Sequence, residues 1–155
     1  LLQKYTLWDT PIEFVPGAKE LLSTLFDSAM AIYKIFVVTA STRQCMEQVL
    51  STLWIKEKFD EVISIYDIDP QTQKPYISKW EPEVYMRLQQ KYNFEKFLMI
   101  EDGTTGMNGA IKAWWKAIAI LGDNTKEKFP QAVSWHKDLR SIKVELLYDI
   151  LNTIY

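Results

Sequence analysis

The chain has 155 residues, a formal net charge of −2 at pH 7 and a single cysteine. This length allows one domain with a sizeable core, and so small a charge argues against nucleic acid or an anionic membrane as a partner. One cysteine excludes an internal disulfide and indicates a reducing, cytoplasmic compartment, and no apolar run reaches the roughly 20 residues that cross a bilayer.

The first half of the chain predicts helix, strand, helix and strand in turn. A helix is expected over "PGAKELLSTLFDSAMA", whose apolar residues recur at helical spacing after a Pro-Gly turn. The run "KIFVVTA" is short, β-branched and apolar, which is typical of a strand buried on both faces. "STRQCMEQVLSTL" predicts a helix with Ser41 or Thr42 as its N-cap, and "FDEVISIYDI" contains the next strand.

The second half continues the alternation. Residues 66–79 form the longest irregular stretch, and "EPEVYMRLQQKY" then predicts a helix with Pro82 in its first turn. A strand in "KFLMIED", a helix in "GMNGAIKAWW", a strand in "KAIAIL" and a terminal helix in "DLRSIKVELLYDILNTIY" follow. This order predicts an α/β fold with a mainly parallel sheet.

Polar residues gather where three of these strands end, and ligands of parallel sheets bind outside the carboxyl ends of the strands. The residues are Thr39-Ala40-Ser41 after the first strand, Lys79 downstream of the second, and Glu101-Asp102 after the third.

These clusters suit a phosphate bound together with a metal ion. The adjacent carboxylates of Glu101 and Asp102 repel each other unless a positive charge lies near them, and Mg²⁺ prefers such oxygen ligands. A hydroxyl such as Thr39 or Ser41 at a helix N-terminus suits phosphate oxygens, and Lys79 would neutralise the same group. Each cluster alone is more typical of a solvated acid pair, a helix cap or a surface lysine than of a functional site, so their joint order carries the prediction.

The order of motifs resembles the haloacid dehalogenase (HAD) superfamily, in its branch of β-phosphoglucomutases and phosphoglycolate phosphatases. "VPGAKELLSTL" resembles the helix that follows the cap of that branch, and "VVTAST" resembles the second motif, with Thr39 at the phosphate-binding position. "SKWEPEVY" resembles the third motif, with Lys79 at the lysine position. "MIEDGTTGMNGAIKA" resembles the fourth, with Glu101 and Asp102 at the metal-binding positions and Gly106 at the glycine position.

The resemblance implies a Rossmann-like three-layer α/β/α sandwich. Residues 16–155 would form the HAD-like core, and residues 1–15 would be the end of a helical cap and its return linker, so that the cap is missing or reduced to its last helix. Three positions depart from the family pattern without removing a charge. They are Trp80 in place of proline, Gly103 in place of serine, and Trp114 in place of the glycine that usually ends the helix.

The first motif of the superfamily, Asp-x-Asp-x-Thr, supplies the nucleophilic aspartate, and no Asp-x-Asp lies ahead of residue 67. Either the nucleophile strand lies upstream of this chain, or "YTLWD" is a degenerate motif that places Leu2 and Lys4 at the aspartate positions. In the family this strand is central, flanked by the strands of the second and fourth motifs. A missing central strand would leave unpaired backbone groups, each costing about 1–3 kcal/mol, which favours an upstream nucleophile.

The resemblance therefore implies a Mg²⁺-dependent phosphatase that acts on a small phosphomonoester through an aspartyl-phosphate, and a phosphomutase would use the same residues. The 155 residues alone lack the nucleophile. The alternative is an inactive HAD-like module that binds a phosphorylated ligand or a protein partner. The expected roles are catalysis by Thr39 and Lys79, phosphate binding by Thr39, Ala40, Ser41 and Lys79, and Mg²⁺ binding by Glu101 and Asp102.

Other conspicuous residues are expected to be structural. His136 has no partner at metal-ligand spacing, and Cys45 falls within a predicted helix. The pair Trp114-Trp115 is expected to pack its helix against the sheet, unless it is exposed and marks an interface.

Overall fold

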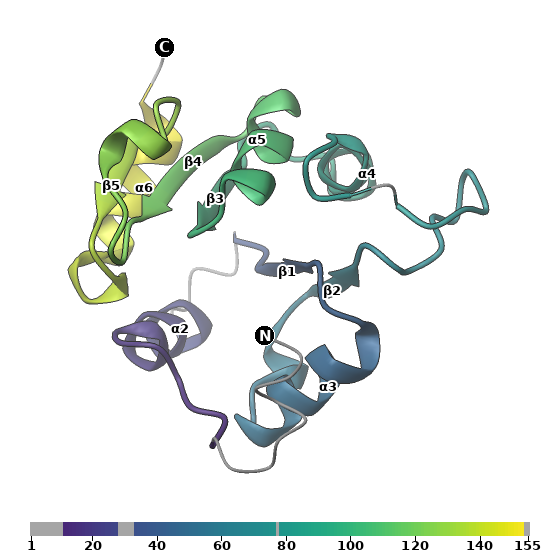
Figure 1. The fold of residues 1–155 in the computed structure, drawn as a ribbon, viewed down its shortest axis with the longest axis horizontal. Coiled ribbons are helices and arrows are strands. Elements are labelled where there is room, and N and C mark those ends of the chain that lie inside the picture. Colours follow the sequence, from purple (N-terminus) through teal and green to yellow (C-terminus); the bar gives the residue numbers. More distant parts are fainter. Residues whose placement is uncertain (1–10, 28–32, 77, 154–155) are drawn as a thin grey trace. The chain divides into compact units, whose positions relative to one another are not determined.

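The computed structural model forms two compact units, and each unit is built from two separate segments of the sequence (Figure 1). It describes residues 11–27, 33–76 and 78–153. The first unit comprises Leu1–Phe14 and Ser28–Ser78, and the second comprises Val15–Asp27 and Lys79–Tyr155. Leu2 and Lys4 lie outside the described residues, and the cap helix expected over residues 1–15 stays a prediction.

The first unit contains a two-stranded parallel sheet. Strand β1 (Phe36–Thr39) pairs with β2 (Glu61–Ser64), in a register that sets Thr39 beside Ser64. The carboxyl ends of the two strands therefore meet at one edge of this sheet, where the sequence placed its first polar cluster.

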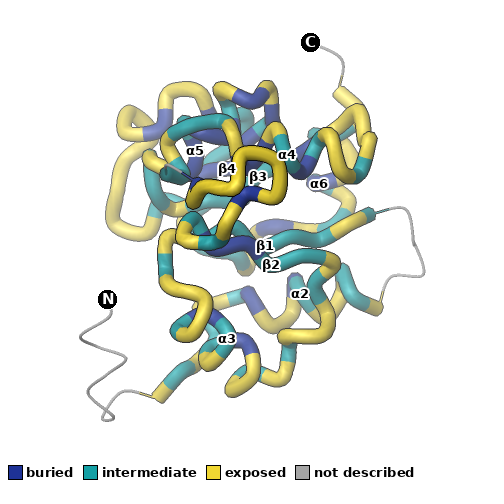
Figure 2. Tube along the Cα trace, turned by 90° about the vertical axis from the view of Figure 1, so that its right-hand side faces the viewer, coloured by how far each residue is buried: buried dark blue, intermediate teal, exposed yellow. Residues whose placement is uncertain are grey.

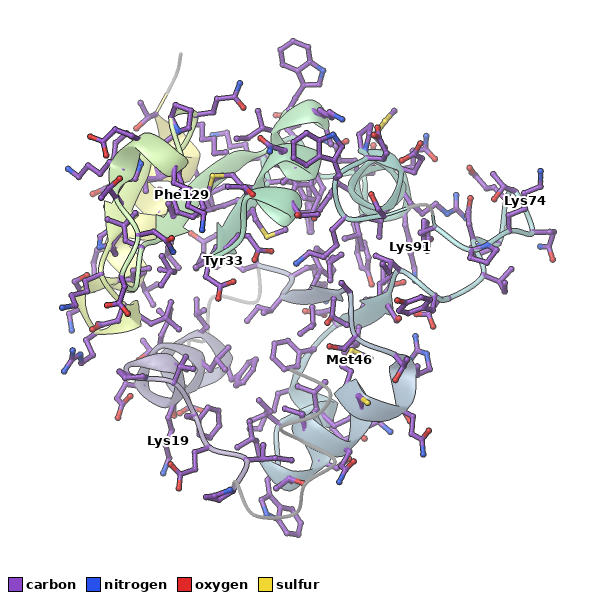
Figure 3. The ribbon with its side chains drawn as sticks, in the orientation of Figure 1. Lys19, Tyr33, Met46, Lys74, Lys91 and Phe129 are labelled. Carbon is purple, nitrogen blue, oxygen red and sulfur yellow. The ribbon has the colours of Figure 1, made fainter. Side chains whose placement is uncertain are left out.

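The helix α3 (Arg43–Thr52) follows β1 and packs against β2. It begins where the sequence predicts, because the side chain of Thr42 accepts a hydrogen bond from the Cys45 amide, so the N-cap is Thr42. Met46, which Figure 3 labels, and Leu50 lie one turn apart and are buried. Cys45 is half-buried and unbonded to another cysteine.

The second unit is built on a three-stranded parallel sheet in the order β3-β4-β5. The strands are β3 (Leu98–Glu101), β4 (Lys116–Ile120) and β5 (Ser134–His136). Strand β5 was not predicted, because its three residues include two polar side chains and show no apolar run.

Helices cover both faces of this sheet, which confirms the predicted α/β/α layering within the unit. The two helices on one side are α4 (Glu83–Tyr92) and α5 (Thr104–Lys112), and those on the other are α2 (Ala18–Asp27) and α6 (Val144–Asn152). The short 3-10 turns are η1 (Lys56–Lys58), η2 (Lys126–Lys128) and η3 (Leu139–Ser141).

The alternating side chains of β4 supply the two halves of the core, as period-two geometry requires. Ala117 and Ala119 pack with Met107 of α5 and with Phe129, which Figure 3 labels, on one face. Ile118 faces the opposite way and packs with side chains of α2, α6 and the turn before α6, namely Leu21, Ile142 and Leu147.

The strand β1 is less buried than its apolar sequence predicted. Every residue of β1 and of β3 is only half-buried, whereas the three central residues of β4 are buried (Figure 2). The expectation of burial on both faces was therefore wrong for β1. The cause is that, among the described residues, β1 pairs only with β2 and β3 pairs only with β4.

The helix α5 ends earlier than predicted, and this separates the two tryptophans. The helix stops at Lys112, and Trp114 then adopts a left-handed backbone with φ of 66° and is 93% exposed. Trp115 is buried, stacks on Phe97 with ring centroids 4.6 Å apart, and meets Tyr85 edge-on at 5.2 Å. Only the second tryptophan packs as expected.

The C-terminal segment also differs from the single helix predicted for it. The turn η3 and the helix α6 are separate, and Lys116 of β4 donates to the carbonyls of Ile150 and Thr153 at the end of α6 at 2.5 and 2.6 Å. His136 is satisfied as expected, with Nε2 2.8 Å from Ser134 Oγ and Nδ1 2.7 Å from Ser141 Oγ.

In the part of the chain that the structure describes, no helix has both the length and the apolar character needed to cross a membrane.

Asp60 ties the start of β1 to the start of β2. Its carboxylate accepts hydrogen bonds from Lys34 Nζ at 2.7 Å and from the Ile35 amide at 2.8 Å. Burial alone would raise the pKa of Asp60, but these two bonds outweigh burial and lower the pKa below that of an ordinary carboxyl.

We expect Asp60 to stabilise the first unit at neutral pH and to lose this effect in acid. A carboxyl whose pKa is lower in the folded state stabilises fully above its unfolded pKa of about 3.9, and the effect disappears as pH falls through the folded pKa. Asp60→Asn should therefore lower the urea midpoint at pH 7 and approach the wild type below about pH 4. An equally large difference at both pH values would contradict this assignment.

Trp114→Gly should raise the thermal midpoint. The left-handed backbone costs a residue with a side chain roughly 1–2 kcal/mol, which exceeds the roughly 0.5–1 kcal/mol of extra entropy that glycine loses on folding. The indole of Trp114 is already exposed, so its removal loses little hydrophobic burial. The matched control is Trp114→Ala, which removes the indole but keeps a Cβ and should bring no gain; an equal gain in both variants would refute the explanation by strain.

Candidate functional site

The first polar cluster lies in the first unit, at the junction of β1 and α3. Thr39 is the last residue of β1 and is half-buried, Ala40 is exposed, and Ser41 is half-buried. The Ser41 amide donates to Thr39 Oγ1 at 3.0 Å. A hydroxyl that accepts one hydrogen bond still has its own hydrogen to donate, so Thr39 keeps the capacity to donate to an acceptor.

The second and third clusters meet in the second unit. Lys79 Nζ lies 2.5 Å from Glu101 Oε2, and the two side chains are only 14% and 11% exposed. Lys79 precedes α4 and Glu101 ends β3, so the contact joins positions 22 residues apart in sequence. This shielded ion pair is the main electrostatic feature of the unit.

The second oxygen of Glu101 is also occupied. Glu101 Oε1 accepts hydrogen bonds from the amides of Asp102 at 3.2 Å and Gly103 at 3.1 Å. Burial raises the pKa of Glu101 above that of an ordinary glutamate, although the charge and hydrogen bond of Lys79 oppose the increase. Glu101 thus points inward, toward Lys79 and the start of α5.

Asp102 differs from its neighbour because it is exposed and comes after the end of β3. Among the described residues, no three or more His, Cys, Asp or Glu side chains are arranged to hold a metal ion. An exposed carboxylate suits Mg²⁺, which is usually held by one or two carboxylates and completed by water and phosphate oxygens. The residues present therefore fit part of a Mg²⁺ site, with Asp102 as its most accessible ligand.

Two glycines of α5 have no side chain, and this leaves space for the Lys79–Glu101 ion pair. A Cβ on Gly106 would collide with the carboxylate of Glu101 and with Lys79 Cε. A Cβ on Gly109 would collide with the carbonyl oxygen of Lys79 and with the ring of Tyr85. Side chains at these positions would push Lys79 away from β3.

Tyr85 braces the same region from α4. It is fully buried, and its hydroxyl donates to the carbonyl of Gly106 at 3.1 Å. Burial first, and the charge of Glu101 second, raise the pKa of Tyr85, so the phenol stays protonated. Tyr85 and Gly106 fitted the motifs in the sequence, but their contact with each other and the importance of Gly109 were not predicted.

The departures from the family pattern are tolerated for visible reasons. Trp80 is 44% exposed, and Lys112 Nζ lies 5.2 Å from the centre of its ring. Gly103 is the N-cap of α5 and has no side chain to cap the helix. Its own amide donates to Glu101 Oε1, which fixes the start of the loop before α5.

The predicted site residues thus fall into two groups. The structure brings Lys79, Glu101 and Asp102 together in the second unit, and it places the Thr39-Ala40-Ser41 cluster in the first.

Gly109→Ala should destabilise the protein, although alanine is the better helix former by about 1 kcal/mol. The new methyl group would meet backbone and a buried ring, neither of which can move freely, and such overpacking costs about 1–3 kcal/mol. The comparison is Gly103→Ala, whose Cβ would lie at an ordinary 3.4 Å from Glu101 Oε1. It should cost only the preference of the N-cap position for glycine over alanine, and therefore less than Gly109→Ala. Chemical unfolding of both variants checks this; a stabilised Gly109→Ala protein would show that the close packing is absent.

The sequence profile of the haloacid dehalogenase-like hydrolases matches residues 3–120 of the chain. Among solved structures, a provisionally named β-phosphoglucomutase from Thermotoga maritima has a TM-score of 0.67 and 20% identity, over 88% of this chain and 61% of that one. A haloacid dehalogenase-like protein of unknown function from Agrobacterium tumefaciens has a TM-score of 0.64 and 15% identity, with the same two shares.

The core domain of a provisionally named phosphoglycolate phosphatase from Streptococcus pneumoniae has a TM-score of 0.56 and 22% identity, over 90% of this chain and 88% of that one. The chain spans about three fifths of the length of the first two structures. A search of curated proteins gave no significant match. At such identities the solved structures show a common fold, and the profile covers most of the sequence. The chain therefore belongs to the haloacid dehalogenase-like hydrolase family.

Proposed function

We propose that this chain works in a Mg²⁺-dependent phosphatase that hydrolyses a small phosphorylated substrate through an aspartyl-phosphate, whose aspartate lies outside residues 1–155. The observation that carries the proposal is the shielded Lys79–Glu101 pair beside the exposed carboxylate of Asp102. A fixed ammonium group such as that of Lys79 suits a phosphate, and an accessible carboxylate such as that of Asp102 suits the Mg²⁺ that accompanies the phosphate.

Lys79 would bind the phosphoryl group and stabilise the charge that develops as it is transferred. An ammonium has three N–H donors, and Glu101 occupies one of them in the structure. The pair holds the Lys79 side chain in one place before the substrate arrives, so less conformational entropy is lost on binding. Glu101 would act through Lys79 by fixing its position.

Thr39 would donate its hydroxyl hydrogen to a phosphoryl oxygen, with the amide of Ala40 next to it in the loop before α3. The Ser41 amide donates to Thr39 Oγ1, so Ser41 would hold the Thr39 hydroxyl in place through that bond. The action of Thr39 and Lys79 on one phosphoryl group is part of the proposal. It rests on the family membership and on the order of motifs in the sequence.

Asp102 would hold Mg²⁺ directly, and Glu101 would contribute second because both of its oxygens already accept hydrogen bonds. When bound, the ion would neutralise the phosphoryl oxygens and help to align them. The remaining ligands would be water, the phosphate and the aspartate outside this chain.

In the family order of strands, the strand that carries this aspartate lies between the strands of the second and fourth motifs. Among the described residues, the corresponding strands β1 and β3 are half-buried, and each pairs along only one edge. A strand with an unpaired edge favours the addition of another strand, which supports the proposal. We further propose a cytoplasmic location and no nucleic-acid partner, in keeping with the single cysteine and the small net charge.

A second candidate is an inactive HAD-like module that binds a phosphorylated ligand or a protein. This reading rests on Leu2 and Lys4, which occupy the aspartate positions if "YTLWD" is a degenerate first motif. The module would keep phosphate affinity through Lys79 and Thr39 but would not turn over a substrate.

We expect the natural full-length protein to hydrolyse p-nitrophenyl phosphate with Mg²⁺ and to stop when EDTA removes the ion. Asp102→Asn should reduce kcat at least tenfold, because removal of a metal-binding or charge-stabilising group costs ~10²–10³ in comparable sites. Asp102 is exposed, so this change should leave the unfolding midpoint unaltered.

The matched control is Asp149→Asn, which removes an equally exposed carboxylate on α6 and should leave turnover unchanged. Phosphate binding without turnover would support the inactive module. Neither binding nor turnover, in a folded protein, would refute the phosphatase and the phosphate-binding module, and would leave only a module that binds a protein.

A further inference from the structure

Ser64, at the end of β2, is bonded to the loop that carries the predicted phosphate-binding residues. Its side chain is fully buried, and its Oγ donates to the carbonyl of Ser41 at 2.7 Å while accepting from the Tyr66 amide at 3.2 Å. The backbone of the same region joins Ile65 to the carbonyl of Thr39 at 3.0 Å. Buried hydroxyls bonded on both sides fix the groups they touch.

Asp67 and Arg43 complete the support from the other side of the loop. Arg43 is the first residue of α3, and its Nε and Nη2 donate to the two oxygens of Asp67 at 2.9 and 2.5 Å. Arg43 Nη2 also donates to the carbonyl of Val62 at 3.1 Å, and Asp67 Oδ2 accepts from the Ser64 amide at 2.8 Å. This bidentate pairing fixes the orientation of the Arg43 guanidinium group and also balances its charge.

We propose that Ser64, Asp67 and Arg43 are positioning residues for the phosphate-binding loop. They hold the main chain of Ser41 and the start of α3, so that the Thr39 hydroxyl and the loop amides keep one geometry toward a phosphoryl group. The inference rests on the proposed function, since it assigns the support of that phosphate site. It also means that Arg43 does not bind the phosphate itself.

The contacts of Arg43 argue against a direct role. Its Nε and Nη2 are occupied by Asp67 and Val62, and Nη1 lies 3.6 Å from Glu47 Oε1. An arginine that served as a phosphate ligand would have to give up this fork. Instead, the side chain turns toward β2 and joins the first turn of α3 to that strand.

The test is a titration of the natural full-length protein with inorganic phosphate, followed by amide chemical shifts of residues 39–43. Asp67→Asn distinguishes a phosphate ligand from a positioning residue, because the two roles of Arg43 predict opposite changes in phosphate affinity. If Arg43 were a ligand, loss of the nearby negative charge would release it and strengthen phosphate binding. If it is a positioning residue, the loop loosens and affinity falls roughly three- to tenfold, as expected for losing one or two ordering hydrogen bonds.

Arg43→Lys gives a second criterion. Lysine keeps the charge and could replace a direct ligand, but it cannot reproduce the fork to Asp67. We expect Arg43→Lys to lower phosphate affinity as Asp67→Asn does. Ser64→Ala should also lower it, because this change removes the hydrogen bond to the Ser41 carbonyl. The matched control is Asp60→Asn, which removes another paired carboxylate of the same unit away from the loop and should leave phosphate affinity unchanged.

The outcomes separate this inference from the proposed function. Weaker phosphate binding in Asp67→Asn and Arg43→Lys, with the control unchanged, supports the positioning roles. Unchanged or stronger binding in Asp67→Asn overturns them while leaving the phosphate site intact. A folded wild type that binds no phosphate at all overturns the phosphate site and, with it, this inference.

Discussion

The candidate site of the second unit depends on one shielded charge pair, Lys79 with Glu101. Both side chains are largely removed from water, which is costly for each charge alone. Removing one partner of a buried pair typically costs about 3–5 kcal/mol, because the other charge is left uncompensated. Each of the two side chains therefore keeps the other in position. It also accounts for two adjacent acids at one strand end, since Glu101 is neutralised inside and Asp102 points to solvent.

The surroundings of this pair are shaped by missing side chains as much as by those present. Gly106 and Gly109 leave one face of α5 without side chains. A Cβ on Gly106 would meet the side chains of Glu101 and Lys79, and a Cβ on Gly109 would meet the backbone of Lys79. Tyr85 then fixes α5 through the carbonyl of Gly106. The first unit uses a different device, in which a buried hydroxyl and an arginine fork hold the main chain of the loop. In the second unit a side-chain ion pair holds Lys79, and in the first unit side chains hold the main chain next to Thr39.

The sequence predicted the parts of the fold that local patterns encode. Helix caps and apolar spacing placed α3 and α4 within about two residues, and the order of polar clusters picked out Lys79, Glu101 and Asp102. The pairing of Lys79 with Glu101 was not predictable from spacing, since it joins positions 22 residues apart through tertiary packing. The roles of Ser64 and Asp67 were missed for the same reason.

Other errors arose where the local pattern was weak or misleading. The strand β5 is short and polar, so it gave no signal. The apolar run of β1 predicted complete burial, but burial depends on a neighbouring strand, which the run itself cannot reveal. The left-handed turn at Trp114 is usually filled by glycine, so residue type alone gave no stop there, although the family pattern has its helix-ending glycine at this position.

A crystal structure of the natural full-length protein with Mg²⁺ and inorganic phosphate would test the proposed site most directly. We expect one phosphate that accepts hydrogen bonds from Lys79 Nζ and Thr39 Oγ1, with Mg²⁺ bound to Asp102 and Lys79 still in contact with Glu101. A phosphate bound elsewhere, or a metal ion that does not contact Asp102, would contradict it.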